Sequence, residues 1–278
     1  GSKVREFEDA IGKYCGAKYA VAVSSGTAAL HLASLVAGLG AGDEAVTSPV
    51  TFLATANAIV YAGATPVFAD VDYETANIDP EKLSRAITRR TKAVLPVHLA
   101  GLPCDMESIA RLSRAKGLTV IEDACHALGA EYRGEKIGSC RYSDMTVFSF
   151  HPVKPITTGE GGCITTNSAK HYKRLMALRS HGVYRNPGLQ RRHGGWFSEM
   201  RELGFNYRIT DFQCALGLSQ LAKLDHFLAK REAVARRYNR AFQDLGPRVK
   251  LPALLYPDRR HGWHLYLFRL RPSRQRRP

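Results

Sequence analysis

Short apolar runs rich in valine and isoleucine recur along the first 150 residues, and segments with helical spacing separate them. The runs cover 20–23, 45–47, 66–69, 93–97, 119–121 and 146–150, and helices are predicted over about 27–39, 52–62, 80–90 and 105–116. Strands without polar alternation are typical of a sheet that is covered on both faces. The alternation therefore predicts an α/β fold with a mainly parallel sheet, in which ligands bind at the carboxyl ends of the strands.

A long helical pattern follows this region. Leu221, Leu224 and Leu228 recur at three- and four-residue spacing, which predicts one long helix over about 210–245. Beyond a proline-containing loop, residues 264–270 alternate like a strand. We therefore expect a large α/β domain over 1–210, a connecting helix over 211–245 and, over 246–278, the remnant of a small C-terminal domain with a basic tail.

The charge of the chain is unevenly distributed. The 278 residues are 45% hydrophobic and carry 40 Lys and Arg against 25 Asp and Glu, a formal net charge of +15. Such an excess is typical of nucleic-acid-binding proteins. Seven arginines fall within 259–278, a segment without Asp or Glu, so a solvated basic tail is favoured over a nucleic-acid-binding protein, which remains an alternative.

The cysteines and the apolar segments indicate a cytoplasmic protein. The six cysteines are scattered without a C-x-x-C pair, so neither a metal site nor a disulfide framework is predicted. No apolar stretch reaches the roughly eighteen residues that a membrane span requires, and no signal-peptide core stands at the start.

Polar residues directly after the predicted strands are the first candidates for a site. Ser24, Ser25, Gly26 and Thr27 follow the first run and open a helix, where free N–H groups and the helix dipole suit a phosphate group. An ordinary Ser/Thr helix cap is the alternative interpretation of this short motif.

Two further candidates follow the strand over 119–121. Asp123 emerges from that buried strand and can accept a hydrogen bond from a protonated ring nitrogen, while His126 is near enough in the chain to help place a ring. A strand-end aspartate that caps the next turn explains the same residue without a ligand.

The stretch 149–162 is the most informative. Lys154 leaves the strand over 146–150 between Pro152 and Pro155 and precedes a glycine-rich turn. Both prolines restrict the backbone, which suits a lysine whose amine must be presented at one point and can form an imine with an aldehyde. An exposed loop lysine is the alternative.

A phosphate-binding turn, a strand-end carboxylate and a restrained lysine are together the three groups that pyridoxal 5'-phosphate (PLP) requires. On these residues the sequence resembles the DegT/DnrJ/EryC1/StrS family of sugar aminotransferases, a branch of the fold-type I PLP enzymes with an aspartate-aminotransferase-like large domain. The matching stretches are 24–30, 51–59, 122–126, 148–154, 159–162 and 204–211. The resemblance spans residues 3 to about 268.

The resemblance implies roles for the candidates in catalysis. Lys154 would bind the cofactor covalently and move a proton between the substrate α-carbon and the cofactor. Asp123 would keep the pyridine nitrogen protonated. Phe52 would stack on the ring, and His126 would lie at the hydroxyl edge of the ring.

The resemblance also implies how the cofactor phosphate is bound. Gly26, Thr27 and Ser149 would bind it within one subunit. Asn206 would reach the phosphate of the neighbouring subunit, so a homodimer with a shared active site is expected. A related subgroup that dehydrates sugars has histidine in place of the lysine, and Lys154 argues against that activity.

For the substrates, the resemblance implies glutamate as amino donor and a nucleotide-linked keto-deoxysugar as acceptor, in cell-surface glycan or secondary-metabolite sugar biosynthesis. The stretch 151–162 is most similar to the transaminases of pseudaminic acid synthesis, which aminate C-4 of a UDP-linked 4-keto-6-deoxy-N-acetylhexosamine. The segment 185–201, with Arg191, Arg192, His193 and Trp196, is basic and aromatic; it either faces the nucleotide or forms a solvated loop.

Family members usually have more chain at both ends. We therefore expect a cleft open to water, and we expect cofactor binding more firmly than efficient turnover. A catalytically silent PLP-binding dimer is the main alternative.

Overall fold

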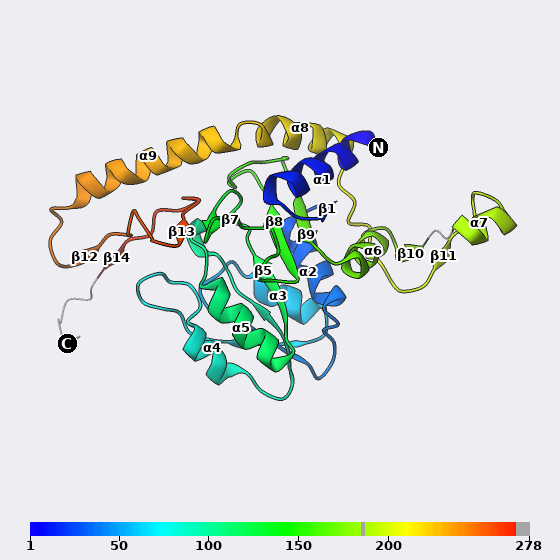
Figure 1. The fold of residues 1–278 in the computed structure, drawn as a ribbon, viewed down its shortest axis with the longest axis horizontal. Coiled ribbons are helices and arrows are strands. Elements are labelled where there is room, and N and C mark those ends of the chain that lie inside the picture. The colour runs from blue at the N-terminus through cyan, green and yellow to red at the C-terminus, as the bar shows by residue number, and fades with distance from the viewer. Residues whose placement is uncertain (185–186, 271–278) are drawn as a thin grey trace, which may run out of the picture.

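The computed structural model describes residues 1–184 and 187–270, and a seven-stranded sheet forms its centre (Figure 1). The strand order is β1-β9-β8-β5-β4-β2-β3. The strands are β1 (Tyr19–Val23), β2 (Glu44–Thr47), β3 (Thr65–Phe68), β4 (Thr91–Leu95), β5 (Thr119–Asp123), β8 (Met145–Ser149) and β9 (Gly162–Thr166). Within this sheet β9 alone runs in the opposite direction to the other six strands, so the predicted mainly parallel α/β fold is confirmed.

Helices cover both faces of the sheet. One face packs against α1 (Ser2–Cys15), α4 (Pro80–Ala86) and α5 (Met106–Lys116), and the other packs against α2 (Gly26–Val36), α3 (Ala54–Tyr61) and α6 (Ala169–Leu178). Strand β1 shows why both faces are apolar: Ala20 and Ala22 enter one core, whereas Val21 and Val23 enter the other. The continuous apolar runs of the sequence follow from this double burial.

The remaining elements are short or lie outside the sheet domain. They are the 3-10 turn η1 (Leu99–Gly101), β6 (Glu131–Tyr132), β7 (Glu135–Lys136), β10 (Val183–Tyr184), α7 (Pro187–His193), β11 (Glu199–Met200), α8 (Asp211–Leu221), α9 (Leu224–Phe242), β12 (Val249–Lys250), β13 (Arg259–Arg260) and β14 (Arg269–Leu270). Among the helices of residues 1–184 and 187–270, none combines the length and the apolar character that a bilayer crossing requires.

The prediction of one long helix over 210–245 was wrong, because two helices, α8 and α9, occupy this segment (Figure 1). At the break, the N–H of Lys223 donates to the carbonyl of Gln220 instead of continuing the α-helical pattern. Leu224 and Leu228 are then buried in the core beside α1. The break thus lets the second helix follow the edge of the domain.

The prediction of a strand over 264–270 was also wrong for most of its length. Only Arg269 and Leu270 pair as a strand, with β12. The N–H groups of His264 and Leu265 donate instead to the carbonyl of Ala100, at 2.8 and 3.1 Å. This segment therefore docks on the turn that follows β4. Of the basic tail predicted over 259–278, residues 271–278 lie outside the described residues.

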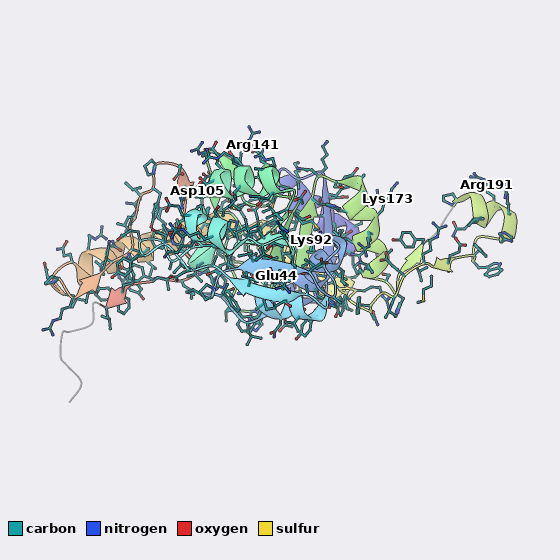
Figure 2. The ribbon with its side chains drawn as sticks, turned by 90° about the horizontal axis from the view of Figure 1, so that it is seen from below. Glu44, Lys92, Asp105, Arg141, Lys173 and Arg191 are labelled. Carbon is teal, nitrogen blue, oxygen red and sulfur yellow. The ribbon has the colours of Figure 1, made fainter. Side chains whose placement is uncertain are left out.

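An arm formed by β10, α7 and β11 projects from the sheet domain, and Arg191 lies near its far end (Figure 2). Within the described residues of α7, none is buried. Residues 185 and 186 of the predicted basic segment lie outside the described residues. Trp196 on this arm is 81% exposed, so the arm presents a large aromatic side chain beside its arginines.

A buried ion pair fastens α1 to the sheet. The guanidinium of Arg179 donates to Glu8 at 2.6 Å and to the carbonyl of Ala22 at 2.7 Å. Glu8 also accepts the N–H of Ala22 at 2.9 Å. Because both side chains are almost fully buried, removal of one leaves an uncompensated charge.

We expect Glu8→Ala to lower the free energy of unfolding by about 3 kcal/mol, because it leaves Arg179 buried without its carboxylate. Urea-induced unfolding measures the change. Lys3→Ala is the matched control on the same helix: it breaks an exposed pair with Glu6, and we expect less than about 0.5 kcal/mol. Equal effects of the two substitutions would contradict this account.

Candidate active site

A cavity of about 580 Å³ opens at the carboxyl ends of β1, β5 and β8. The predicted site residues that line it are Gly26, Thr27, Phe52, Asp123, His126, Ser149 and Lys154. These residues come from four separate stretches of the sequence, and the sheet brings them to one edge. Lys154 and Asp123, which the sequence assigned to one cofactor, therefore line the same cavity.

The first turn of α2 forms a site that fits an anion. The hydroxyl of Ser25 caps the helix by accepting the N–H of Ala28 at 3.0 Å, which leaves the earlier N–H groups of the turn available. A Cβ on Gly26 would lie 2.7 Å from the Cβ of Ser149, and a Cβ on Gly162 would lie 2.4 Å from the carbonyl oxygen of Ser25. Glycine at both positions lets β8 and β9 approach the turn closely, and the resulting cradle suits a phosphate group.

Asp123 is 5% exposed, and hydrogen bonds reach both oxygens of its carboxylate. Oδ2 accepts the hydroxyl of Thr55 at 2.7 Å, and Oδ1 accepts the N–H of Cys125 at 3.1 Å. Each oxygen keeps a further lone pair, so the carboxylate can still accept a proton donor from the cavity. This arrangement fits the protonated nitrogen of a pyridine ring.

Lys154 is held at the mouth of the turn after β8. Its N–H donates to the carbonyl of His151 at 2.9 Å, and the neighbouring Ile156 is buried in the core. The positive charge of Lys154 is close enough to the imidazole of His126 to help lower the pKa of that ring. The lysine is therefore anchored through its backbone, and it lines the cavity together with Asp123 and Ser149.

Two imidazoles lie side by side next to this lysine. The ring centroids of His126 and His264 are 4.3 Å apart. Burial, together with the charge of Lys154, lowers the pKa of His126 to about 3 and that of His264 to about 4. Both rings are therefore neutral at pH 7, and within the described part of the chain neither Nδ1 has a hydrogen-bond partner.

Sequence reasoning missed Thr55 and His264. Thr55 lies within a stretch that matched the family, but the pattern assigned it no role. His264 lies where the sequence predicted a strand, and its contact with His126 arises because the chain docks on Ala100. The only available signal for His264 was its position in an aromatic segment of the C-terminal region.

Asn206 is not among the described residues that line the cavity. It is exposed and forms an isolated antiparallel bridge with Ser180. The bridge fixes its backbone next to α6, and its predicted contact with the phosphate of a second subunit stays a prediction.

The fold and the geometry of this cavity define an enzyme of the PLP-dependent transferase type. The sequence model of the DegT/DnrJ/EryC1/StrS aminotransferase family matches residues 1–278, and the chain belongs to this family. The predicted family, fold class and aminotransferase activity are thereby confirmed.

Known relatives agree with this assignment. The chain is 46% identical to the GDP-perosamine synthase of Caulobacter vibrioides over 270 residues, which are 97% of this chain and 70% of that protein. PseC of Helicobacter pylori, an aminotransferase involved in the biosynthesis of pseudoaminic acid, superposes with a TM-score of 0.88 at 35% identity, over 98% of this chain and 70% of that chain. A sugar aminotransferase of Streptococcus pneumoniae in its PLP form superposes with a TM-score of 0.87 at 31% identity. The match covers 97% of this chain and 71% of that chain.

We expect acid to destabilise the protein between about pH 6.5 and pH 4, partly through His264. Its pKa is about 4 in the folded chain and about 6.5 in the unfolded chain. Over this interval the unfolded chain therefore binds more protons, and the free energy of unfolding decreases as the pH decreases. His264→Phe should lower the proton uptake on unfolding by up to about one proton, measured from the pH dependence of urea unfolding. His226→Phe, which changes an exposed histidine on α9, is the control. An unchanged slope in His264→Phe would show that this ring takes no part.

Proposed function

We propose that this chain is a PLP-dependent aminotransferase that transfers the amino group of glutamate to the keto group of a nucleotide-linked deoxysugar. The observation that supports it best is the convergence of Lys154, Asp123 and the first turn of α2 on one cavity. The family uses this cofactor, and the cradle between Gly26 and Ser149 fits its phosphate.

When bound, PLP supplies an electron sink that stabilises negative charge at the α-carbon of the amino substrate. The residues of this chain do the rest. Lys154 binds the cofactor through its amine and, once released, carries a proton to or from the α-carbon. Asp123 holds a proton on the ring nitrogen, and Phe52 offers its aromatic face to the ring. His126, kept neutral by burial, provides a hydrogen-bonding edge without adding charge.

The sugar substrate is the finer part of the proposal. The similarity of the stretch 151–162 to pseudaminic acid transaminases supports amination at C-4 of a UDP-linked 4-keto-6-deoxy-N-acetylhexosamine. The similarity to a GDP-perosamine synthase supports the same class of sugar with a different nucleotide. We therefore place the reaction in cell-surface glycan or secondary-metabolite sugar biosynthesis, with the UDP sugar as the first candidate.

A homodimer completes the proposed site. Phe52 and Leu53, at the start of α3, are 65% and 60% exposed beside the cavity, and Phe212 on α8 is 91% exposed. Large apolar side chains exposed to this extent are typical of surfaces that a second subunit covers. In the dimer, Asn206 of each subunit would contact the cofactor phosphate of the other.

We expect the purified protein to bind PLP with a visible absorbance band, to lose that band on addition of glutamate, and to aminate a UDP-linked 4-ketosugar in preference to dTDP- or GDP-linked ones. Lys154→Ala should abolish the visible band and lower turnover at least about a hundredfold, because the proton-transferring amine is lost. Absorbance spectra and mass spectrometry of the sugar products measure both effects.

Lys170→Ala changes an exposed lysine at the start of α6 and should behave as wild type. Normal turnover in Lys154→Ala would refute the role proposed for Lys154. Normal glutamate reaction with amination of a GDP- or dTDP-linked sugar would refute only the choice of nucleotide.

Asn206→Ala should weaken cofactor binding, and mixing it with Lys154→Ala should restore activity. Each variant lacks one residue of every site in its own homodimer. In a mixed dimer, one of the two sites keeps both residues, so random mixing restores about a quarter of the sites. Turnover at limiting PLP, measured before and after subunit exchange, tests this. Failure of the mixture to exceed the separate variants would place Asn206 in its own subunit's site or outside any site.

A further inference from the structure

The carboxylate of Asp123 is connected to the start of α3 through hydroxyl groups. Thr55, fully buried in the first turn of α3, places its Oγ1 2.7 Å from Oδ2 of Asp123. The same Oγ1 lies 2.8 Å from the hydroxyl of Thr51 and 3.2 Å from the carbonyl oxygen of Phe52. One buried hydroxyl thus meets three possible partners.

The single proton of Thr55 fixes the direction of these bonds. A hydroxyl donates one hydrogen bond, and the bond to an ionised carboxylate is the strongest of the three as well as the shortest. Thr55 therefore donates to Asp123, and its oxygen accepts the hydroxyl proton of Thr51. The chain of donors runs from Thr51 through Thr55 to Asp123.

This chain determines how the carboxylate is presented to the cavity. With Thr55 on one oxygen and the N–H of Cys125 on the other, the carboxylate plane cannot rotate without losing a hydrogen bond. Phe52, which lines the cavity, belongs to the same turn as Thr55, which binds Asp123. A shift of this turn therefore moves both residues together.

We propose that Thr55 is a positioning residue that orients Asp123 toward the ring nitrogen of the cofactor, with Thr51 as the outer donor. The inference rests on the proposed function. The inference extends the proposed function, because it assigns the orientation of the Asp123 carboxylate to a side chain of α3 rather than to β5, the strand that carries Asp123. A purely structural role for Thr55, as a hydroxyl that stabilises the start of α3 through Phe52, is the competing account.

The test compares PLP with an analogue in which carbon replaces the ring nitrogen. Dissociation constants are measured by absorbance titration of the cofactor-free wild type, Thr55→Val and Thr55→Ser. With PLP we expect Thr55→Val to bind roughly tenfold more weakly, because a donor to a charged acceptor is lost, and Thr55→Ser to stay near wild type. With the carbon analogue, wild type and Thr55→Val should bind alike, since no ring nitrogen meets Asp123.

Thr47→Val is the matched control. Thr47 is also fully buried, but its hydroxyl donates to the carbonyl of Leu95 instead of a carboxylate. Any general cost of losing a buried threonine hydroxyl will appear equally in thermal unfolding of both valine variants, while the preference for PLP over the analogue should change only in Thr55→Val.

The outcomes separate the two proposals. Equal losses of affinity for PLP and for the analogue in Thr55→Val, or no loss at all, overturn the positioning role and leave the aminotransferase assignment intact. Should Thr55→Val not fold, failure of Thr55→Ser to keep the wild-type preference for PLP overturns it equally. A wild type that binds neither ligand overturns both proposals.

Discussion

Two neighbouring carboxylates at the end of β5 impose the constraint on which the site depends. Glu122 and Asp123 point to opposite faces of a buried strand and are 3% and 5% exposed. A buried carboxylate is tolerated only where hydrogen-bond donors surround it, so each face must supply its own set. Glu122 receives donors from His98, Ser143 and Thr146, whereas Asp123 receives them from Thr55 and Cys125.

The hydrogen bonds to Glu122 stabilise the strand that carries Asp123. Burial raises the pKa of Glu122, but the hydrogen bond and the charge of His98, with the two hydroxyls, outweigh it and hold the pKa below its usual value. The N–H of His98 in turn donates to the carbonyl of Asp123 at 3.1 Å. The position of Asp123 is thereby fixed on its backbone by the buried pair of His98 and Glu122, and on its side chain by the hydroxyl of Thr55 in α3.

The sequence predicted those features that depend on residues close together in the chain. The Val- and Ile-rich runs predicted the strands. The Ser-Gly-Thr turn and the proline-flanked Lys154, which were selected for their chemistry, line one cavity. Contacts between distant segments were not accessible in this way. Thr55 and Asp123 are 68 residues apart, and nothing in the local pattern of α3 distinguishes its threonine from an ordinary helix residue. The break between α8 and α9 escaped prediction for a related reason, since it depends on where Leu224 meets the core.

The residues proposed to contact the cofactor are therefore mechanically linked. Helix α2, whose first turn forms the anion cradle, packs against α3 in the same apolar core. Thr55 lies in the first turn of α3, and Phe52 lies just before that helix. A shift of α3 relative to α2 changes the distance between the phosphate cradle, the ring-facing aromatic and the donor to Asp123 at once. Residues that act on one rigid unit give non-additive effects when they are substituted. Substitutions in the α2–α3 core, far from the reacting atoms, should accordingly affect cofactor affinity in the same direction as loss of the Thr55 hydroxyl, because both disturb one alignment.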